Sequence, residues 1–266
     1  MNSRIRNSLA FATAAALGLC ACDHQVESIS EDQKVRTVVL VHGAFADGTG
    51  WRGVYDVLTR RGYRVAIVQN PLTSFADDVN ATRRVLDRQN GPVILVGHSY
   101  GGSVITEAGT APNVVGLVYV SALAPDVGES TGDQFVKIPA PPEFVIETGS
   151  DGFGFVNMSQ FKAGFADDTS DKDAAFLRDA QVPINMDIFS TSLTQAAWRT
   201  KPSWAVVATQ DRAIAPRLLL EQAERIGAKV TKVEASHVVF LTRARAVAEV
   251  IDTAAQEASA LFPDKQ

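Results

Sequence analysis

The pentapeptide GHSYG at residues 97–101 follows the apolar run VILV at 93–96 and precedes the segment GSVITEA at 102–108. The apolar run is typical of a buried strand, and the segment after the pentapeptide can form a helix. A serine between two glycines at a strand-to-helix turn is the pattern of a nucleophile elbow, in which a strained backbone lifts the hydroxyl above the sheet. The sequence therefore predicts Ser99 as a nucleophile. It also places the Tyr100 N–H at a helix N-terminus, where an oxyanion would form.

A serine nucleophile needs a base, and the chain has only four histidines, at positions 24, 42, 98 and 237. His98 lies inside the pentapeptide, His42 ends the apolar run 37–41, and position 24 lies beside an N-terminal leader. His237 comes just after the expected strand 229–233, so it can lie over the same sheet edge as Ser99. We therefore predict that His237 takes the Ser99 proton during attack and returns it to the leaving group.

The histidine in turn needs a carboxylate that fixes its tautomer. Asp211 follows the expected strand 204–209 almost directly and is the predicted acid. An aspartate at such a place can also serve as a helix N-cap or turn residue. Asp126, which follows the expected strand 114–120, is the alternative acid.

A tetrahedral oxyanion is usually held by two backbone N–H groups, and Tyr100 is expected to supply one of them. The other should come from the loop HGAF at 42–45, after the first central strand. We predict the Ala44 N–H as this second donor, with Phe45 as the fallback. The remaining residues expected around the substrate pocket are His42, Gly43, Trp51 and His98.

These motifs resemble the α/β-hydrolases, in the branch of the plant methylesterases, hydroxynitrile lyases and small bacterial serine esterases. The likeness rests on HGA at 42–44, GW at 50–51, GHSYGG at 97–102, Asp211 and His237. It covers the chain from about residue 35 to the end. It implies an α/β fold with a mostly parallel central sheet flanked by helices, an inserted cap region, and a triad in the order serine, acid, histidine.

Two departures from these relatives narrow the expected reaction. Hydroxynitrile lyases of this branch usually carry threonine at the place of Gly43 and lysine directly after the catalytic histidine, where this chain has Val238. Haloalkane dehalogenases use an aspartate nucleophile in place of Ser99. The expected reaction is hydrolysis of a small or medium carboxylic ester, lactone or thioester. The alternatives are C–C cleavage or perhydrolysis on the same site, or a non-enzymatic ligand-binding relative.

Length and composition fit one catalytic domain over residues 35–266, since 46% of the 266 residues are hydrophobic. Expected strands alternate with helical segments except over about 126–201, a stretch rich in Pro, Gly and Asp without a clear strand. We interpret this stretch as a cap, with helical pieces expected over 158–165 and 173–179. Its scattered phenylalanines, among them Phe144, Phe161 and Phe165, are expected to form mainly the core of the cap.

The N-terminus carries two arginines and then an apolar run of eleven residues at 9–19, the pattern of a secretory signal peptide over residues 1–21. The sequence LCAC at 19–22 is similar to a bacterial lipobox and would make Cys22 the lipidated first residue. Cleavage after a small residue without lipidation is the alternative. Residues 22–34 would be a tether, and the protein is expected to be exported, either periplasmic or membrane-anchored.

Both cysteines lie at the end of this leader, at positions 20 and 22, so the folded part holds none for a disulfide or a thiolate metal site. No phosphate-binding loop or dinucleotide fingerprint is present, and we expect no cofactor and no metal. The net charge of −5 argues against nucleic acid as a partner. A small-molecule ester is the expected partner, any contact with a membrane would run through the lipid anchor, and the oligomeric state stays open.

Overall fold

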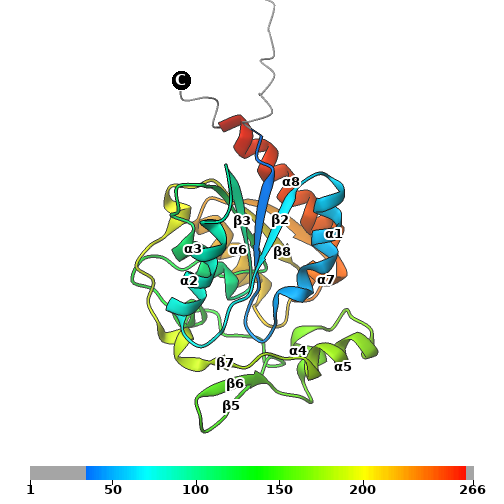
Figure 1. The fold of residues 1–266 in the computed structure, drawn as a ribbon. Coiled ribbons are helices and arrows are strands. Elements are labelled where there is room, and N and C mark those ends of the chain that lie inside the picture. Colours follow the sequence, from blue (N-terminus) through cyan, green and yellow to red (C-terminus); the bar gives the residue numbers. More distant parts are fainter. Residues whose placement is uncertain (1–33, 262–266) are drawn as a thin grey trace, which may run out of the picture.

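A computed structural model describes residues 34–261. Its main sheet has six strands, all parallel, in the order β2-β1-β3-β4-β8-β9 (Figure 1). The strands are β1 (Thr37–Val41), β2 (Arg64–Val68), β3 (Val93–His98), β4 (Val114–Val120), β8 (Ser203–Ala208) and β9 (Lys229–Val233). The expected α/β architecture around a parallel sheet is confirmed.

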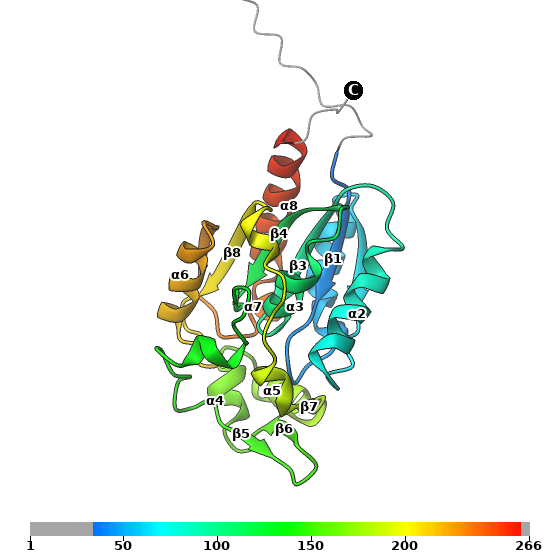
Figure 2. The same ribbon diagram turned by 90° about the vertical axis from the view of Figure 1, so that its left-hand side faces the viewer.

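Helices cover both faces of this sheet. Helices α1 and α8 pack against each other on one face, and α2 and α3 pack together on the other (Figures 1 and 2). The helices around the main sheet are α1 (Arg52–Arg60), α2 (Phe75–Leu86), α3 (Gly101–Ala108), α6 (Pro216–Arg225), α7 (Val239–Thr242) and α8 (Ala244–Leu261). A short 3-10 helix, η2 (Gly48–Trp51), precedes α1.

The burial of the strands follows their composition. Every residue of β1 (TVVLV) and β3 (VILVGH) is buried, because both faces of a central parallel strand are covered by helices. The edge strand β9 (KVTKV) exposes all but its last residue, and its two lysines disfavour pairing with another chain. The strand that leads into the predicted nucleophile, β3, is therefore buried along its whole length.

The segment between β4 and β8 forms a cap over the carboxyl ends of the main strands (Figures 1 and 2). It holds an antiparallel sheet of β5 (Ile146–Thr148), β6 (Phe153–Val156) and β7 (Ile184–Asn185). Its helices are α4 (Phe161–Phe165) and α5 (Asp171–Asp179), and its 3-10 turns are η3 (Gly132–Phe135), η4 (Met186–Ser190) and η5 (Ala197–Arg199).

The segment contains three strands, although no strand is clear in its sequence. Its strands are only two to four residues long, too short for an alternating pattern to be visible in the sequence. The first expected helix begins at Phe161, three residues later than predicted. The second begins two residues earlier than predicted, because the Ser170 side chain accepts the Asp173 N–H and caps the helix.

Side-chain carboxylates hold the two ends of the cap in place. Glu107 of α3 is buried, and its carboxylate accepts the backbone N–H groups of Thr194 and Gln195 at 2.8 and 2.9 Å. At the start of the cap, Asp126 forms an ion pair with Arg199, which lies near the end of the cap. Both ends of the inserted segment are thus fixed by polar contacts.

The two ends of the described chain meet at the pole opposite the cap (Figure 1). The Val35 N–H, just before β1, donates to the Ser259 hydroxyl of α8 at 2.9 Å. No helix among residues 34–261 is both long and apolar enough to span a bilayer. The predicted leader 1–21, the lipidation site Cys22 and all but the last residue of the predicted tether 22–34 lie outside the described residues.

Candidate active site

Ser99 occupies the turn between β3 and α3 in a left-handed backbone conformation, with φ = +54°. A non-glycine residue in this region is strained, and here the surrounding main chain holds it in place. A Cβ at Gly97 would lie 2.4 Å from the Gly101 carbonyl oxygen, and one at Gly101 would lie 2.7 Å from the His42 carbonyl oxygen. The two glycines of the pentapeptide are therefore required by close contacts between backbones.

His237 and Asp211 form a buried pair in the loops after β9 and β8. The His237 Nδ1 lies 2.7 Å from the Asp211 Oδ2, and both side chains are almost fully excluded from solvent. A carboxylate oxygen only accepts, so Nδ1 carries the proton and Nε2 is left with its lone pair. The other oxygen, Asp211 Oδ1, accepts the N–H groups of Ala213 and Ile214 at 2.8 and 2.9 Å. The carboxylate is thus held in one orientation.

The alternative acid, Asp126, lies in a different environment. Its two carboxylate oxygens contact the Arg199 guanidinium, each at 2.8 Å. The hydrogen bond from Arg199 lowers the pKa of Asp126. The structure therefore brings Asp211, and not Asp126, to the Nδ1 of His237.

Both predicted oxyanion donors and the fallback border one cavity with Ser99. Ala44, Phe45 and Tyr100 all line it. Within residues 34–261, no described acceptor takes the N–H of Ala44 or of Tyr100. Phe45 itself is left-handed, with φ = +62°, so this loop stores backbone strain as the serine turn does.

The Tyr100 side chain is fixed from below by a buried carboxylate. Its hydroxyl donates to Asp78 Oδ2 at 2.7 Å, and Asp78 Oδ1 accepts the Leu72 N–H at 2.8 Å. Burial raises the pKa of Asp78 to about 6 and raises the pKa of Tyr100. This network holds the residue whose backbone N–H borders the cavity.

The four residues expected around the pocket do not line this cavity; they lie beneath it, in the core. Trp51 is fully buried, and its ring packs on Phe240. The His98 Nε2 donates to the His237 carbonyl oxygen at 3.0 Å, and burial lowers the pKa of His98. These aromatic rings support the His237 loop from below, and none of them lines the cavity at Ser99.

His42 and Gly43 support the serine turn in the same way. The His42 Nε2 accepts the Asn70 N–H at 2.8 Å, so the proton on Nδ1 faces the Gly43 carbonyl oxygen at 2.9 Å. Burial lowers the pKa of His42. A Cβ at Gly43 would lie 2.8 Å from the Cβ of Ser99, so this position leaves no room for a side chain.

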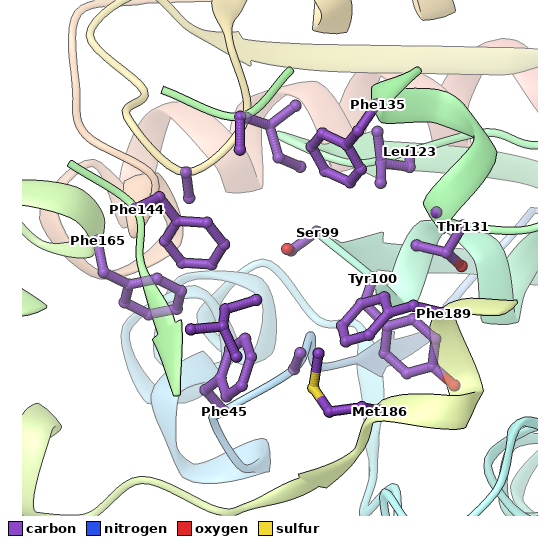
Figure 3. A pocket seen from close by; sticks show the side chains of 16 residues that line it. Phe45, Ser99, Tyr100, Leu123, Thr131, Phe135, Phe144, Phe165, Met186 and Phe189 are labelled. Carbon is purple, nitrogen blue, oxygen red and sulfur yellow. The ribbon is translucent and has the colours of Figure 1, made fainter. Parts of the chain in front are cut away.

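The cavity at Ser99 has a volume of about 350 Å³ and a strongly apolar lining (Figure 3). The Ser99 hydroxyl points into the space that the surrounding side chains enclose. Most of its walls were not predicted from the sequence: they are Leu123 and Ile214 from the main domain and Thr131, Phe135, Ile146, Met186 and Phe189 from the cap. Phe144 and Phe165, expected mainly in the cap core, also line it. The aromatic residues of the cap were the available sequence signal for these walls. Which of their side chains point into the cavity depends on how the cap folds.

Comparison with known proteins places this site in a family. The sequence profile of the alpha/beta hydrolase family matches residues 38–250. The chain is 26% identical over 244 residues to the alpha/beta hydrolase nvfD of Aspergillus novofumigatus, covering 83% of this chain and 97% of that protein. It is 30% identical over 175 residues to a carbendazim hydrolyzing esterase of a Nocardioides species, covering 60% of this chain and 64% of that enzyme.

A solved structure shares the fold over most of its length. An extracellular alpha/beta-hydrolase from a Paenibacillus species, described as homologous to Tobacco Salicylic Acid Binding Protein 2, superimposes with a TM-score of 0.69. The match covers 82% of this chain and 98% of that one at 19% identity, which shows a common fold. Together with the family profile, these likenesses confirm the resemblance to the α/β-hydrolases. The chain belongs to the alpha/beta hydrolase family.

Proposed function

We propose that this protein is a serine hydrolase that cleaves a small or medium carboxylic ester, lactone or thioester through an acyl-enzyme. The observation that carries the proposal is an elbow serine that opens into an apolar cavity, together with the buried His237–Asp211 pair, which packs against Phe165 in the wall of that cavity. The names of the relatives add support, because the Nocardioides protein is an esterase that acts on carbendazim.

The proposed roles follow from this geometry. The Ser99 Oγ attacks the carbonyl carbon while the His237 Nε2 takes the hydroxyl proton, and the Asp211 carboxylate stabilises the imidazolium that forms. The backbone N–H groups of Ala44 and Tyr100 hold the oxyanion, and the loss of one such donor typically costs about 10²–10³ in rate. His237 then protonates the leaving oxygen as its bond to the acyl carbon breaks.

Deacylation repeats these steps with water as the nucleophile. His237 takes a proton from the water as it attacks the acyl carbon, and then returns the proton to Ser99 Oγ as the acid leaves. The apolar cavity favours an uncharged acyl group, because a charged group would lose its hydration without a partner there.

The experiment that tests this function is hydrolysis of p-nitrophenyl acetate, butyrate and octanoate, with Ser99→Ala as the matched variant. We expect turnover that falls by at least about 10³-fold in Ser99→Ala, since triad members act as a unit. The dependence of the hydrolysis rate on acyl chain length reports the size of the pocket that binds the acyl group. Unchanged activity in Ser99→Ala, or a folded protein that hydrolyses no ester in this series, would count against the proposal.

We also propose that the protein is exported and that Cys22 carries a lipid. This rests on the apolar run at 9–19 and the lipobox-like LCAC at 19–22. In a bacterial host, the full chain should incorporate labelled palmitate, and Cys22→Ser should not. A processed but unlabelled protein would instead support plain secretory cleavage.

A further inference from the structure

A second, larger cavity lies beside the proposed catalytic histidine and has no part in the function argued so far. Its volume is about 610 Å³, and it is bordered by α5, α7 and the loop after β1. Apolar side chains, including Phe161, Leu177, Val238 and Phe240, form much of its lining. A space of this size can hold a ligand group of several rings or a long chain.

Among residues 34–261, Phe45 and Phe165 alone line both this second cavity and the cavity at Ser99. The Phe165 ring packs edge-on against the His237 ring, with 5.0 Å between ring centroids. Phe144 links the two side chains, since its centroid lies 6.2 Å from each of theirs. Figure 3 shows all three on the same side of Ser99. The wall between the two cavities, formed by the side chains of Phe45 and Phe165 and called the partition below, therefore lies next to His237, the proposed general base.

The groups on each side of this partition differ in a way that assigns the two halves of a substrate. Ser99 and the oxyanion donors Ala44 and Tyr100 border the first cavity and not the second. Residues that follow His237, Val238 and Phe240 among them, border the second cavity and not the first. In ester cleavage the acyl carbon bonds to the serine, while the leaving oxygen must face the imidazole that protonates it.

We infer that the second cavity receives the leaving group of the ester, and that the substrate is an ester of an uncharged, ring-containing alcohol. The inference rests on the proposed function, because it assumes ester cleavage at Ser99. The first cavity holds the acyl half, and the side chains of Phe45 and Phe165 flank the bond that is cut.

The charges around the second cavity determine which leaving group it suits. Its lining includes three carboxylates, Asp47, Asp168 and Asp173, against one guanidinium, Arg243. Asp168 accepts hydrogen bonds from the hydroxyls of Ser236 and Thr242 and lies 3.7 Å from Arg243. The excess negative charge disfavours an anionic leaving group, and the apolar lining favours aromatic or alicyclic rings.

A matched pair of substitutions tests the assignment. Ala180 lines only the second cavity and is exposed, while Ala140 lines only the first and is half-buried. Ala180→Trp and Ala140→Trp therefore add the same bulk on opposite sides of the partition. Neither residue belongs to the proposed catalytic machinery. The substrates are butyrate esters of methanol, benzyl alcohol and 2-naphthylmethanol, and methyl esters of acids from acetate to octanoate.

In Ala180→Trp we expect kcat/KM for 2-naphthylmethyl butyrate to fall tenfold or more, while that for methyl butyrate stays within twofold. In Ala140→Trp we expect kcat/KM to fall for methyl octanoate and to stay close to wild type for methyl acetate. Equal losses on all esters in Ala180→Trp, no loss on any of them, or a loss that follows acyl size would overturn the assignment.

A binding measurement separates failure of this inference from failure of the proposed function. By calorimetry, 2-naphthylmethanol should bind to the Ser99→Ala protein, and Ala180→Trp added to it should weaken binding at least fivefold. Adding Ala140→Trp should leave the affinity unchanged. If the wild type hydrolyses no ester but this pattern holds, the proposed function fails, and only the preference of the second cavity for a ring-containing alcohol stands. Absent binding, or equal weakening by both substitutions, would overturn the assignment.

Discussion

The serine turn and the cap differ in what holds them in place. At the turn, backbone atoms contact one another so closely that Gly97 and Gly101 admit no side chain. In the cap, the elements are short, and side-chain carboxylates such as Glu107 fix its ends. The difference teaches that the proposed chemistry depends on local sequence and rigid main chain, whereas the substrate walls depend on long-range contacts.

The largest expected effect concerns the proposed catalytic residues, on the side of the comparison that includes the serine turn. Asp211→Asn should lower kcat by about 10⁴-fold, because the asparagine amide would favour the wrong imidazole tautomer. The far-ultraviolet circular dichroism and the urea midpoint should show that the fold remains. Asp126→Asn is the matched control and should leave kcat within about twofold, as Asp126 bonds to Arg199 in the cap. The reverse pattern would identify Asp126 as the acid.

A pair of glycine substitutions compares the rigidity of the two regions. Gly101→Ala should reduce the free energy of unfolding by about 1–3 kcal/mol or more, since its Cβ would lie 2.7 Å from a carbonyl oxygen. Gly152→Ala, in the cap, has φ = +82° but no atom within 4 Å of its Cβ. It should cost only about 1–2 kcal/mol, the strain of a left-handed alanine. Urea unfolding measures both, and a larger loss for Gly152→Ala would contradict the comparison.

Removal of the carboxylate beneath the cap should loosen the cap and spare the chemistry. In Glu107→Gln the amide presents one acceptor oxygen where the carboxylate now accepts Thr194 and Gln195 N–H groups and the Thr194 hydroxyl. We expect a loss of about 1–2 kcal/mol in unfolding free energy and faster proteolysis within 126–201. KM should rise more than kcat falls. Cleavage confined to the main domain would show that Glu107 does not anchor the cap.

The change in stability between pH 7 and 5 should arise mainly in the core, since residues 126–201 contain no histidine. Burial lowers the pKa values of His42 and His98. The two imidazoles therefore bind protons in the unfolded chain at a pH at which they stay neutral in the folded protein. Their contribution to stability is therefore lost as pH falls through about 6.5. The raised pKa of Asp78, about 6, opposes this because the folded state takes up a proton there.

The net slope between pH 7 and 5 should be at most about 1.4 kcal/mol of unfolding free energy per pH unit, the value for one proton. It can be measured by urea titration at several pH values. Asp78→Asn removes the group that takes up a proton in the folded state, and the dependence of the unfolding free energy on pH should become steeper. A stability that does not change over this range would contradict the burial of the two neutral imidazoles.

The parts of the molecule that could be predicted from the sequence are those whose structure is determined by residues close together in the chain. The strand at 114–120 was predicted with the bounds that β4 has, because a run of apolar residues in a covered sheet needs no partner to be recognised. Ser99, His237 and Asp211 were predicted because each follows a strand and parallel strands end at one edge. Their catalytic roles stay predictions. Trp51 and His98 were misplaced because sequence shows that an aromatic residue is near the site, but not which side of the backbone it faces.

The hydrogen bond between Val35 and Ser259 has a practical consequence for how the enzyme can be mounted. Both ends of the described domain lie at the pole away from the cap (Figure 1). A solid support, a fusion partner or a bilayer surface joined through either end would face the amino ends of the main strands. The cap and the cavities that it borders would then lie on the side away from the attachment.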